Sequence, residues 1–119
     1  MPHLTLEYSN NLATAITPAV LRAANQALMR TGQFQEMDIK TRAIGFDLFA
    51  IGTADTARGF VTAKLSILSG RSAETKREIA QTLLAALETA IPADGWELQT
   101  SVEILDIDRD SYAKSLRNG

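Results

Sequence analysis

The second residue of the chain, Pro2, carries a group that could act as a base. Initiator methionine is normally removed before a small residue such as proline, and loss of Met1 would leave a free secondary amine at the start of the chain. An α-amino group has a pKa of about 7.7–8.0, and burial lowers that pKa because it disfavours the ammonium form. Such an amine could serve as a general base near neutral pH. The alternative interpretation is a Met-Pro start that plays no part in any mechanism.

A second candidate, Arg71, lies in a turn directly before a predicted helix. The turn reads Ser69-Gly70-Arg71-Ser72, and its last residue is a good N-cap. The N-terminus of a helix presents free backbone N–H groups and a partial positive charge, so an added arginine could bind a carboxylate or a phosphate there. The alternative is an exposed arginine that merely flanks the cap.

Other polar residues point less directly to chemistry. His3 is a general base by residue type, but a lone histidine on the polar face of a terminal strand is more often a packing or surface residue. Glu7 and Glu103 could face each other on neighbouring strands, although their spacing alone cannot show it.

An acidic triplet near the C-terminus resembles the start of a calcium loop. Asp106, Asp108 and Asp110 occupy the first, third and fifth positions of such a loop. However, Ser111 stands where the loop needs glycine and Arg117 stands where it needs glutamate. We therefore interpret the triplet as a solvated acidic turn and expect no metal there.

The composition excludes several classes of protein. The chain has 119 residues, 12 Lys+Arg against 14 Asp+Glu, one histidine and no cysteine. These counts exclude disulfides, thiol nucleophiles and His-rich metal sites, and the near-neutral charge argues against a nucleic-acid partner. There is neither a membrane-length apolar run nor a signal peptide, so we expect a cytoplasmic protein that does not bind membranes.

Hydrophobic periodicity predicts the elements that would position these groups. We expect strands at 2–8, 38–46, 60–68 and 98–105, helices at 18–31 and 73–91, a short hairpin plus connector at 47–59, and a polar tail from Asp106 that wraps or pairs. The chain thus forms a single α+β domain of two fused βαβ units, at about 2–52 and 60–119. The expected four-stranded sheet is mainly parallel or mixed, with both helices on one face. If the other face is apolar, other subunits must cover it.

Taken together, these residues and elements resemble a known family, the tautomerase superfamily. The Met-Pro start, the βαβ repeat and the strand–Gly70-Arg71-Ser72–helix segment at 64–77 carry the resemblance. The fused length, Thr31-Gly32-x-Phe34 and Ile39-x-Thr41-Arg42 are most similar to the 5-carboxymethyl-2-hydroxymuconate Δ-isomerase family.

The resemblance implies a function and an assembly. It implies a homotrimeric isomerase of aromatic-compound catabolism that needs no cofactor. The nitrogen of Pro2 would move a proton between carbons of an unsaturated 2-oxo or 2-hydroxy dicarboxylic or tricarboxylic acid, through a dienolate. Arg71 matches the family arginine that grips a substrate carboxylate. The family's other cation falls on Lys40, where arginine is usual, or on Arg42.

The sequence does not decide which residues form the pocket wall, and it is compatible with two other functions. Phe46, Phe49 and Ile51 are candidates for the apolar wall that would depress the pKa of Pro2. A tautomerase-like hydratase or dehalogenase and a non-catalytic trimeric carboxylate-binding module are the alternatives. Retention of Met1 would favour the binding module, because an acylated proline nitrogen is an amide and cannot act as a base.

Overall fold

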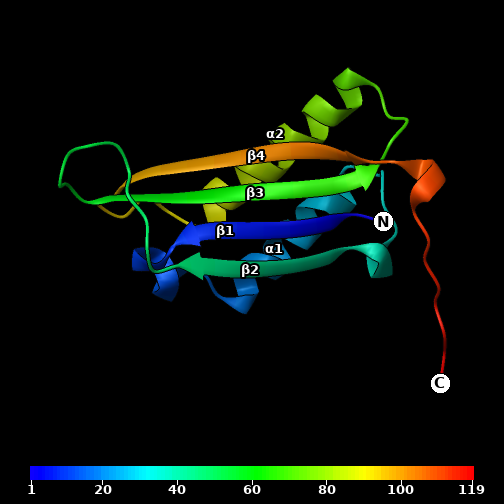
Figure 1. Ribbon diagram of the computed structural model, residues 1–119, viewed down its shortest axis with the longest axis horizontal. Coiled ribbons are helices and arrows are strands. Elements are labelled where there is room, and N and C mark those ends of the chain that lie inside the picture. Colours follow the sequence, from blue (N-terminus) through cyan, green and yellow to red (C-terminus); the bar gives the residue numbers. More distant parts are fainter.

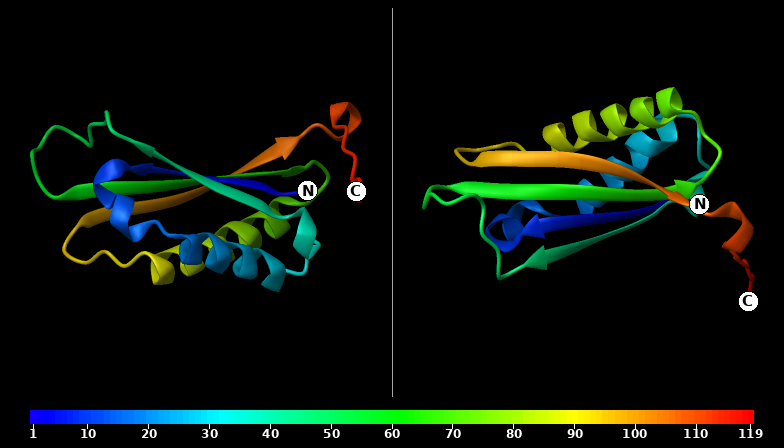
Figure 2. Two further views of the ribbon diagram at one scale, coloured as in Figure 1. Left: turned by 90° about the horizontal axis from the view of Figure 1, so that it is seen from below. Right: turned by 45° about the horizontal axis from the view of Figure 1, so that its top comes forward.

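The computed structural model describes residues 1–119 as a four-stranded sheet with two helices packed on one face (Figures 1 and 2). The strands are β1 (His3–Ser9), β2 (Lys40–Phe46), β3 (Arg58–Leu68) and β4 (Glu97–Ile107). The helices are α1 (Pro18–Arg30) and α2 (Ala73–Ala90). Three short 3-10 helices connect or follow these elements: η1 (Asn10–Ala15), η2 (Glu36–Asp38) and η3 (Arg109–Ser111). No helix is both long and apolar enough to cross a membrane.

The order of the strands confirms the predicted α+β fold. The sheet runs β2-β1-β3-β4, so each βαβ unit contributes a parallel pair, β1 with β2 and β3 with β4. The two units meet through an antiparallel pairing of β1 with β3, in which Leu6 lies opposite Ala63. This arrangement makes the sheet mixed and brings both crossover helices to the same face (Figure 2).

The predicted hairpin at 47–59 is wrong. Residues 47–57 contain no strand, and the chain runs as a loop from β2 to β3. The reason is topological: β1 lies between β2 and β3, so the chain must pass the end of β1 rather than fold back on β2. Arg58 anchors this loop, because its guanidinium donates to the carbonyl of Ile51 at 3.2 Å and to Glu97 at 2.8 Å.

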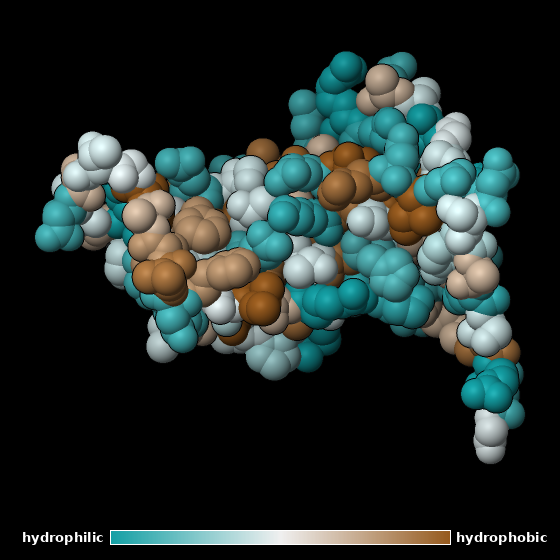
Figure 3. Space-filling model, viewed as in Figure 1, coloured by the Kyte–Doolittle hydropathy of each residue, from teal (hydrophilic) through white to brown (hydrophobic).

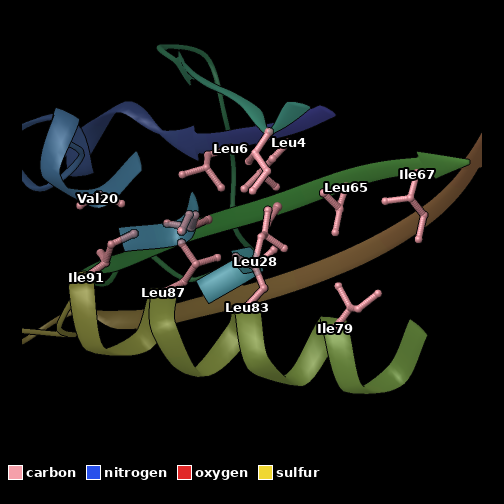
Figure 4. Close-up of a cluster of buried hydrophobic side chains, with 14 of the residues drawn as sticks. Leu4, Leu6, Val20, Leu28, Leu65, Ile67, Ile79, Leu83, Leu87 and Ile91 are labelled. Atoms are coloured by element: carbon pink, nitrogen blue, oxygen red, sulfur yellow. The ribbon is translucent and has the colours of Figure 1, made fainter. Parts of the chain in front are cut away.

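Alternation along the strands builds the core on the helix side of the sheet. In β1, Leu4 and Leu6 are fully buried, whereas their neighbours are only half-buried. The larger core set shares this side and includes Val61 of β3. Figure 4 shows how other members pack between sheet and helices: Leu65 and Ile67 of β3, Leu28 of α1, and Ile79, Leu83 and Leu87 of α2. Apolar stripes with periods of two and 3.6 residues therefore meet in one layer.

Two features of the turn between β3 and α2 fix the position of Arg71. The hydroxyl of Ser72 accepts from the backbone N–H of Thr75 at 3.1 Å, which is the predicted cap of α2. Gly70 has φ of +121°, a conformation that residues with a Cβ rarely adopt, so the chain can turn sharply from β3 into the helix. The turn places Arg71 at the end of the sheet where β1 begins, because β1 and β3 are antiparallel.

The face of the sheet without helices is open but not uniformly apolar. Its middle is polar, with an ion pair of 3.3 Å between Lys64 of β3 and Glu7 of β1. Apolar side chains gather in two places on this face, one over the C-terminal end of β2 and one over β4 (Figure 3). The exposed members are Ile44, Phe46 and Leu105. The face without helices is therefore exposed, as predicted. It is hydrophobic only near the C-terminal end of β2 and over β4.

Candidate active site

Pro2 lies where the ends of all four strands meet the connection into α2. The residue is fully buried, and its carbonyl accepts from the backbone N–H of Lys40 at 3.2 Å, which extends the pairing of β1 with β2. Met1 lies beside a small cavity of about 50 Å³. The other residues that line this cavity are Phe34, Ile67, Leu68, Arg71 and Arg109. Met1, which precedes Pro2, therefore lines a partly apolar pocket that contains two arginines.

The guanidinium of Arg71 is held rigidly at this pocket. Nε donates to Oε1 of Gln33 at 3.0 Å, and Nη2 donates to the carbonyl of Gln33 at 3.1 Å. Nη1 donates to the carbonyl of Leu68 at 3.3 Å, and the charged group lies 4.9 Å from the centre of the Phe34 ring. These contacts use three of the five N–H bonds of the side chain, so two are left for an anion.

Lys40 and Arg42 project from the same face of β2 but have different partners. Lys40 Nζ donates to the backbone carbonyl of Asp38 at 3.1 Å. Arg42 Nη2 lies 3.1 Å from Nδ1 of His3. Lys40 is among the charges that act on the Met1 amine, whereas Arg42 acts on His3. Of the two predicted cations, Lys40 is therefore the one that the structure brings to the N-terminus together with Arg71.

The amine at the N-terminus is surrounded mainly by positive charge. Burial lowers the pKa of the Met1 amine below its usual value of 8.0. Asp38, whose Oδ2 lies 3.8 Å from the nitrogen, acts in the opposite direction, and Lys114, Lys40 and Arg71 lower the pKa further. Together these surroundings shift an amine in this place towards its neutral form, which is the form that can accept a proton.

His3 is neutral and its tautomer follows from its partner. Burial is the main cause of its lowered pKa, and the charges of Arg42 and Lys40 add to the effect. A guanidinium can only donate, so Arg42 assigns Nδ1 as the acceptor and leaves the proton on Nε2. Nε2 lies 3.5 Å from the hydroxyl of Tyr112, which can accept this N–H. The histidine thus links a strand cation to the C-terminal segment.

Three residues near the N-terminal amine, Asp38, Tyr112 and Lys114, were not among the predicted site residues. Lys114 Nζ lies 2.5 Å from Oδ1 of Asp38, and the hydroxyl of Tyr112 donates to Sδ of Met1 at 3.0 Å. The tail was expected only to wrap or pair. Tyr112, the only aromatic residue of this tail, was the signal that the tail contacts the rest of the protein.

The aromatic residues predicted for the pocket wall lie at the other end of the chain's own sheet. Phe46 pairs with Ser9, six residues along the register from the pairing of His3 with Lys40, which is roughly 20 Å at the usual rise of a strand. Phe49 packs edge-on against Phe60, with ring centres 6.1 Å apart. Ile51 belongs to the same loop. Within one subunit, these residues and Pro2 do not converge.

The acidic triplet makes structural contacts. Asp106 accepts from Nζ of Lys76 on α2 at 3.3 Å, and Asp108 accepts from the backbone N–H of Asp110 as the cap of η3. The described side chains include no group of three that could hold a metal ion.

The tandem βαβ sheet, with its buried proline among cations, defines a protein of the tautomerase-fold class. Within this class, the chain belongs to the 5-carboxymethyl-2-hydroxymuconate isomerase family, whose model matches residues 2–116. The resemblance inferred from Pro2 and Gly70-Arg71-Ser72 is thereby confirmed, and the protein is an isomerase.

Solved structures agree with this assignment. A 5-carboxymethyl-2-hydroxymuconate isomerase from Deinococcus radiodurans R1 is 32% identical with a TM-score of 0.87, over 98% of this chain and 90% of that chain. A 5-carboxymethyl-2-hydroxymuconate delta-isomerase shares the fold at 23% identity and a TM-score of 0.76, over 99% and 89% of the two chains. A fused 4-OT, described as a wild-type symmetric trimer, shares the fold at 18% identity and a TM-score of 0.67, over 95% of this chain and 91% of that chain. A search of curated proteins found no match.

Proposed function

We propose that this isomerase moves a proton along an unsaturated 2-oxo or 2-hydroxy dicarboxylic or tricarboxylic acid such as 5-carboxymethyl-2-hydroxymuconate. The base is the amine of Pro2, exposed when Met1 is removed. The observation that carries the proposal is the buried Pro2, which directly follows Met1 at a pocket lined by Arg71, with Lys40 among the charges that act on the N-terminal amine. The reaction would belong to aromatic-compound catabolism in the cytoplasm.

The chemistry needs a base that is neutral at the working pH. The Pro2 amine would lie one residue inward of the Met1 amine, where burial and three cations already lower the pKa of an amine. From a 2-hydroxy acid it would take the proton of the 2-hydroxyl group, and from a 2-oxo acid a proton of an allylic carbon. Either step leaves a dienolate, and the protonated amine would return the proton to a carbon of the same conjugated system. No net charge or oxidation change results, so the residues of the chain suffice for the reaction.

The cations would bind the substrate and stabilise the dienolate. Arg71 presents two unused N–H bonds in a fixed plane, which suits a bidentate carboxylate. Lys40 would act as a point charge beside it, and Arg42 is engaged with His3. Preorganised positive charge lowers the energy of an anionic intermediate without any rearrangement during the reaction.

We propose a homotrimer as the assembly that completes the pocket. The open sheet face, its two hydrophobic ends and the unpaired outer edges of β2 and β4 support association. In such an assembly, Phe46 and Phe49 could reach a Pro2 site only from a neighbouring subunit, because they lie at the far end of their own sheet.

Substitution of Pro2 and Arg71 tests the function. Mass spectrometry first establishes that the mature chain begins at Pro2, and isomerisation of 5-carboxymethyl-2-hydroxymuconate is then followed by absorbance. Acetylation of the Pro2 amine should lower kcat by about 10²- to 10⁴-fold, the usual contribution of a general base, and Pro2→Ala should lower it less because a primary amine remains. Arg71→Ala should raise KM by about 10- to 150-fold, since a charged hydrogen bond contributes about 1.5–3 kcal/mol.

Arg77→Ala is the matched control, because Arg77 is an exposed arginine on α2 for which no hydrogen bond or ion pair is found. It should leave both constants unchanged. An active protein that retains Met1, or Pro2 and Arg71 variants with wild-type rates, would show that the proposed mechanism is wrong.

A further inference from the structure

The C-terminal segment 112–119 begins beside the N-terminus, and its end projects away from the sheet (Figure 1). It leaves η3 and runs past the N-terminus and η2 (Figures 1 and 2). Arg109 fastens the start of the segment, since its Nε donates to the carbonyl of Ser69 at 3.0 Å. Tyr112 contacts Met1 and His3, and Lys114 contacts Asp38. The proposed function assigns no role to these contacts.

Asp38 is the one carboxylate among the charges that act on the N-terminal amine. Its Oδ2 lies 3.8 Å from the Met1 nitrogen, and its Oδ1 receives Lys114 Nζ at 2.5 Å. A free carboxylate at this place would have two harmful effects on the proposed reaction. It would stabilise the protonated amine, and it would compete with the carboxylates of the substrate for Lys40 and Arg71.

We infer that Lys114 is a positioning residue of this site, which binds Asp38 at close range and so weakens the pairing of that carboxylate with the N-terminal amine. The inference rests on the proposed function for its consequence in catalysis, but the contact itself is independent of it. A cation from the C-terminal segment thereby balances the acidic residue, and the same contact fastens the segment beside the amine.

The charges around the N-terminal amine determine whether loss of Lys114 raises or lowers the pKa of that amine. Asp38 raises the pKa of the terminal amine and Lys114 lowers it. The hydrogen bond from Lys114 is the main cause that holds the pKa of Asp38 below its usual range, so the carboxylate stays ionised and paired. The titratable and charged groups that face the amine are His3 of β1, Asp38 of η2, Lys40 of β2, Arg71 before α2, Arg109 of η3, and Tyr112 and Lys114 of the segment. Removal of Lys114 takes away one repulsive cation and frees one attractive anion, and both changes favour the protonated amine.

Titration of the terminal amine tests the inference directly. The protein is labelled with ¹⁵N-proline, its N-terminus is identified by mass spectrometry, and the Pro2 amine is titrated by NMR. Lys114→Met should raise the pKa of the amine by about half a unit to one unit, the size expected for a charge a few ångströms away near the surface. Lys114→Arg should restore the wild-type value. The acid limb of the pH profile of kcat/KM should move to higher pH by the same amount in Lys114→Met.

A double-mutant cycle separates action through Asp38 from direct repulsion. Asp38→Asn should lower the pKa of the amine, and Lys114→Met should shift it less in the Asp38→Asn background than in the wild type. Lys76→Met is the matched control, because Lys76 also pairs with an aspartate at 3.3 Å and is similarly exposed, at 29% against 33% for Lys114. Lys76→Met should leave the pKa of the terminal amine unchanged.

The outcomes distinguish this inference from the proposed function. An unchanged amine pKa in Lys114→Met, or an equal shift in both backgrounds, would overturn the inference. The expected shifts without isomerase activity would overturn the proposed function and leave the inference intact. If mass spectrometry finds Met1 in place, the same titration of the Met1 amine tests the Asp38–Lys114 pair.

Discussion

At the level of single residues, the site is made by side chains whose charge depends on their neighbours. His3 illustrates this dependence. Burial and the cations Arg42 and Lys40 disfavour its imidazolium form, so the ring stays neutral and accepts a hydrogen bond from Arg42. The only histidine of the chain therefore holds Arg42 and faces Tyr112, and it does not serve as the base in the proposed mechanism.

The lowered pKa of His3 predicts a dependence of stability on pH. The unfolded chain binds a proton at His3 near the usual pKa of 6.5, whereas the folded chain binds it only at lower pH. Stability from this residue is therefore present above pH 6.5 and is lost as the pH falls from 6.5 through the folded pKa. Urea unfolding between pH 7.5 and 5.5 should show a smaller loss of stability in His3→Gln than in the wild type. Equal losses in the two proteins would contradict the assignment of a neutral His3.

At the level of elements, two amphipathic helices and a sheet hold the site in place. Arg71 owes its position to the turn between β3 and α2, and its partner Gln33 follows the C-terminal end of α1. Both helices lie on the same layer of buried leucines and isoleucines (Figure 4). Packing in this layer therefore sets the distance between the two segments that hold the guanidinium.

A cavity in that layer should destabilise the fold. Leu83 of α2 is fully buried in the core, so Leu83→Ala should lower the free energy of unfolding by about 2–5 kcal/mol. Leu116→Ala is the matched control, because Leu116 is 61% exposed and its truncation should change the same free energy by less than about 0.5 kcal/mol. Chemical denaturation at one fixed protein concentration measures both. Similar losses in the two variants would show that α2 does not pack as described.

At the level of the whole molecule, one face of the sheet and its two outer edges lack partners. Phe46 lies on the edge strand β2 and is 37% exposed, close to Ile44 on the same face. These side chains are the natural contacts of the proposed homotrimer, because exposed apolar residues at an unpaired edge favour association.

A charge at this edge should weaken the assembly. Phe46→Glu should shift sedimentation from the trimer towards the monomer, since each interface would bury a charge without a partner. Met29→Glu on α1 is the matched control, with 40% exposure on the helix side of the molecule, and it should remain trimeric. A monomeric wild type, or a trimeric Phe46→Glu protein, would contradict the proposed interface.

Local patterns in the sequence predicted most of the elements. The alternation in β1 and β3, the stripes of α1 and α2 and the Ser72 cap all depend on residues within a few positions of one another, and each was confirmed. Pro2 and Arg71 were candidates for the same kind of reason, because their chemistry follows from their own type and immediate neighbours. The hairpin at 47–59 failed because its prediction needed the order of the strands, which no local pattern contains.

Only the tertiary structure decided which of these groups meet. The register of β1 with β2 brings Lys40 to the N-terminus and carries Phe46 to the opposite end. Asp38 and Lys114 are 76 positions apart and share no motif, yet they form an ion pair beside the amine. The physical reason is that a residue's type and its near neighbours determine local conformation, whereas contacts across the sheet depend on the packing of all elements at once. The sequence by itself determined the units of the fold and two candidate groups, and the folded chain determined the charges around them.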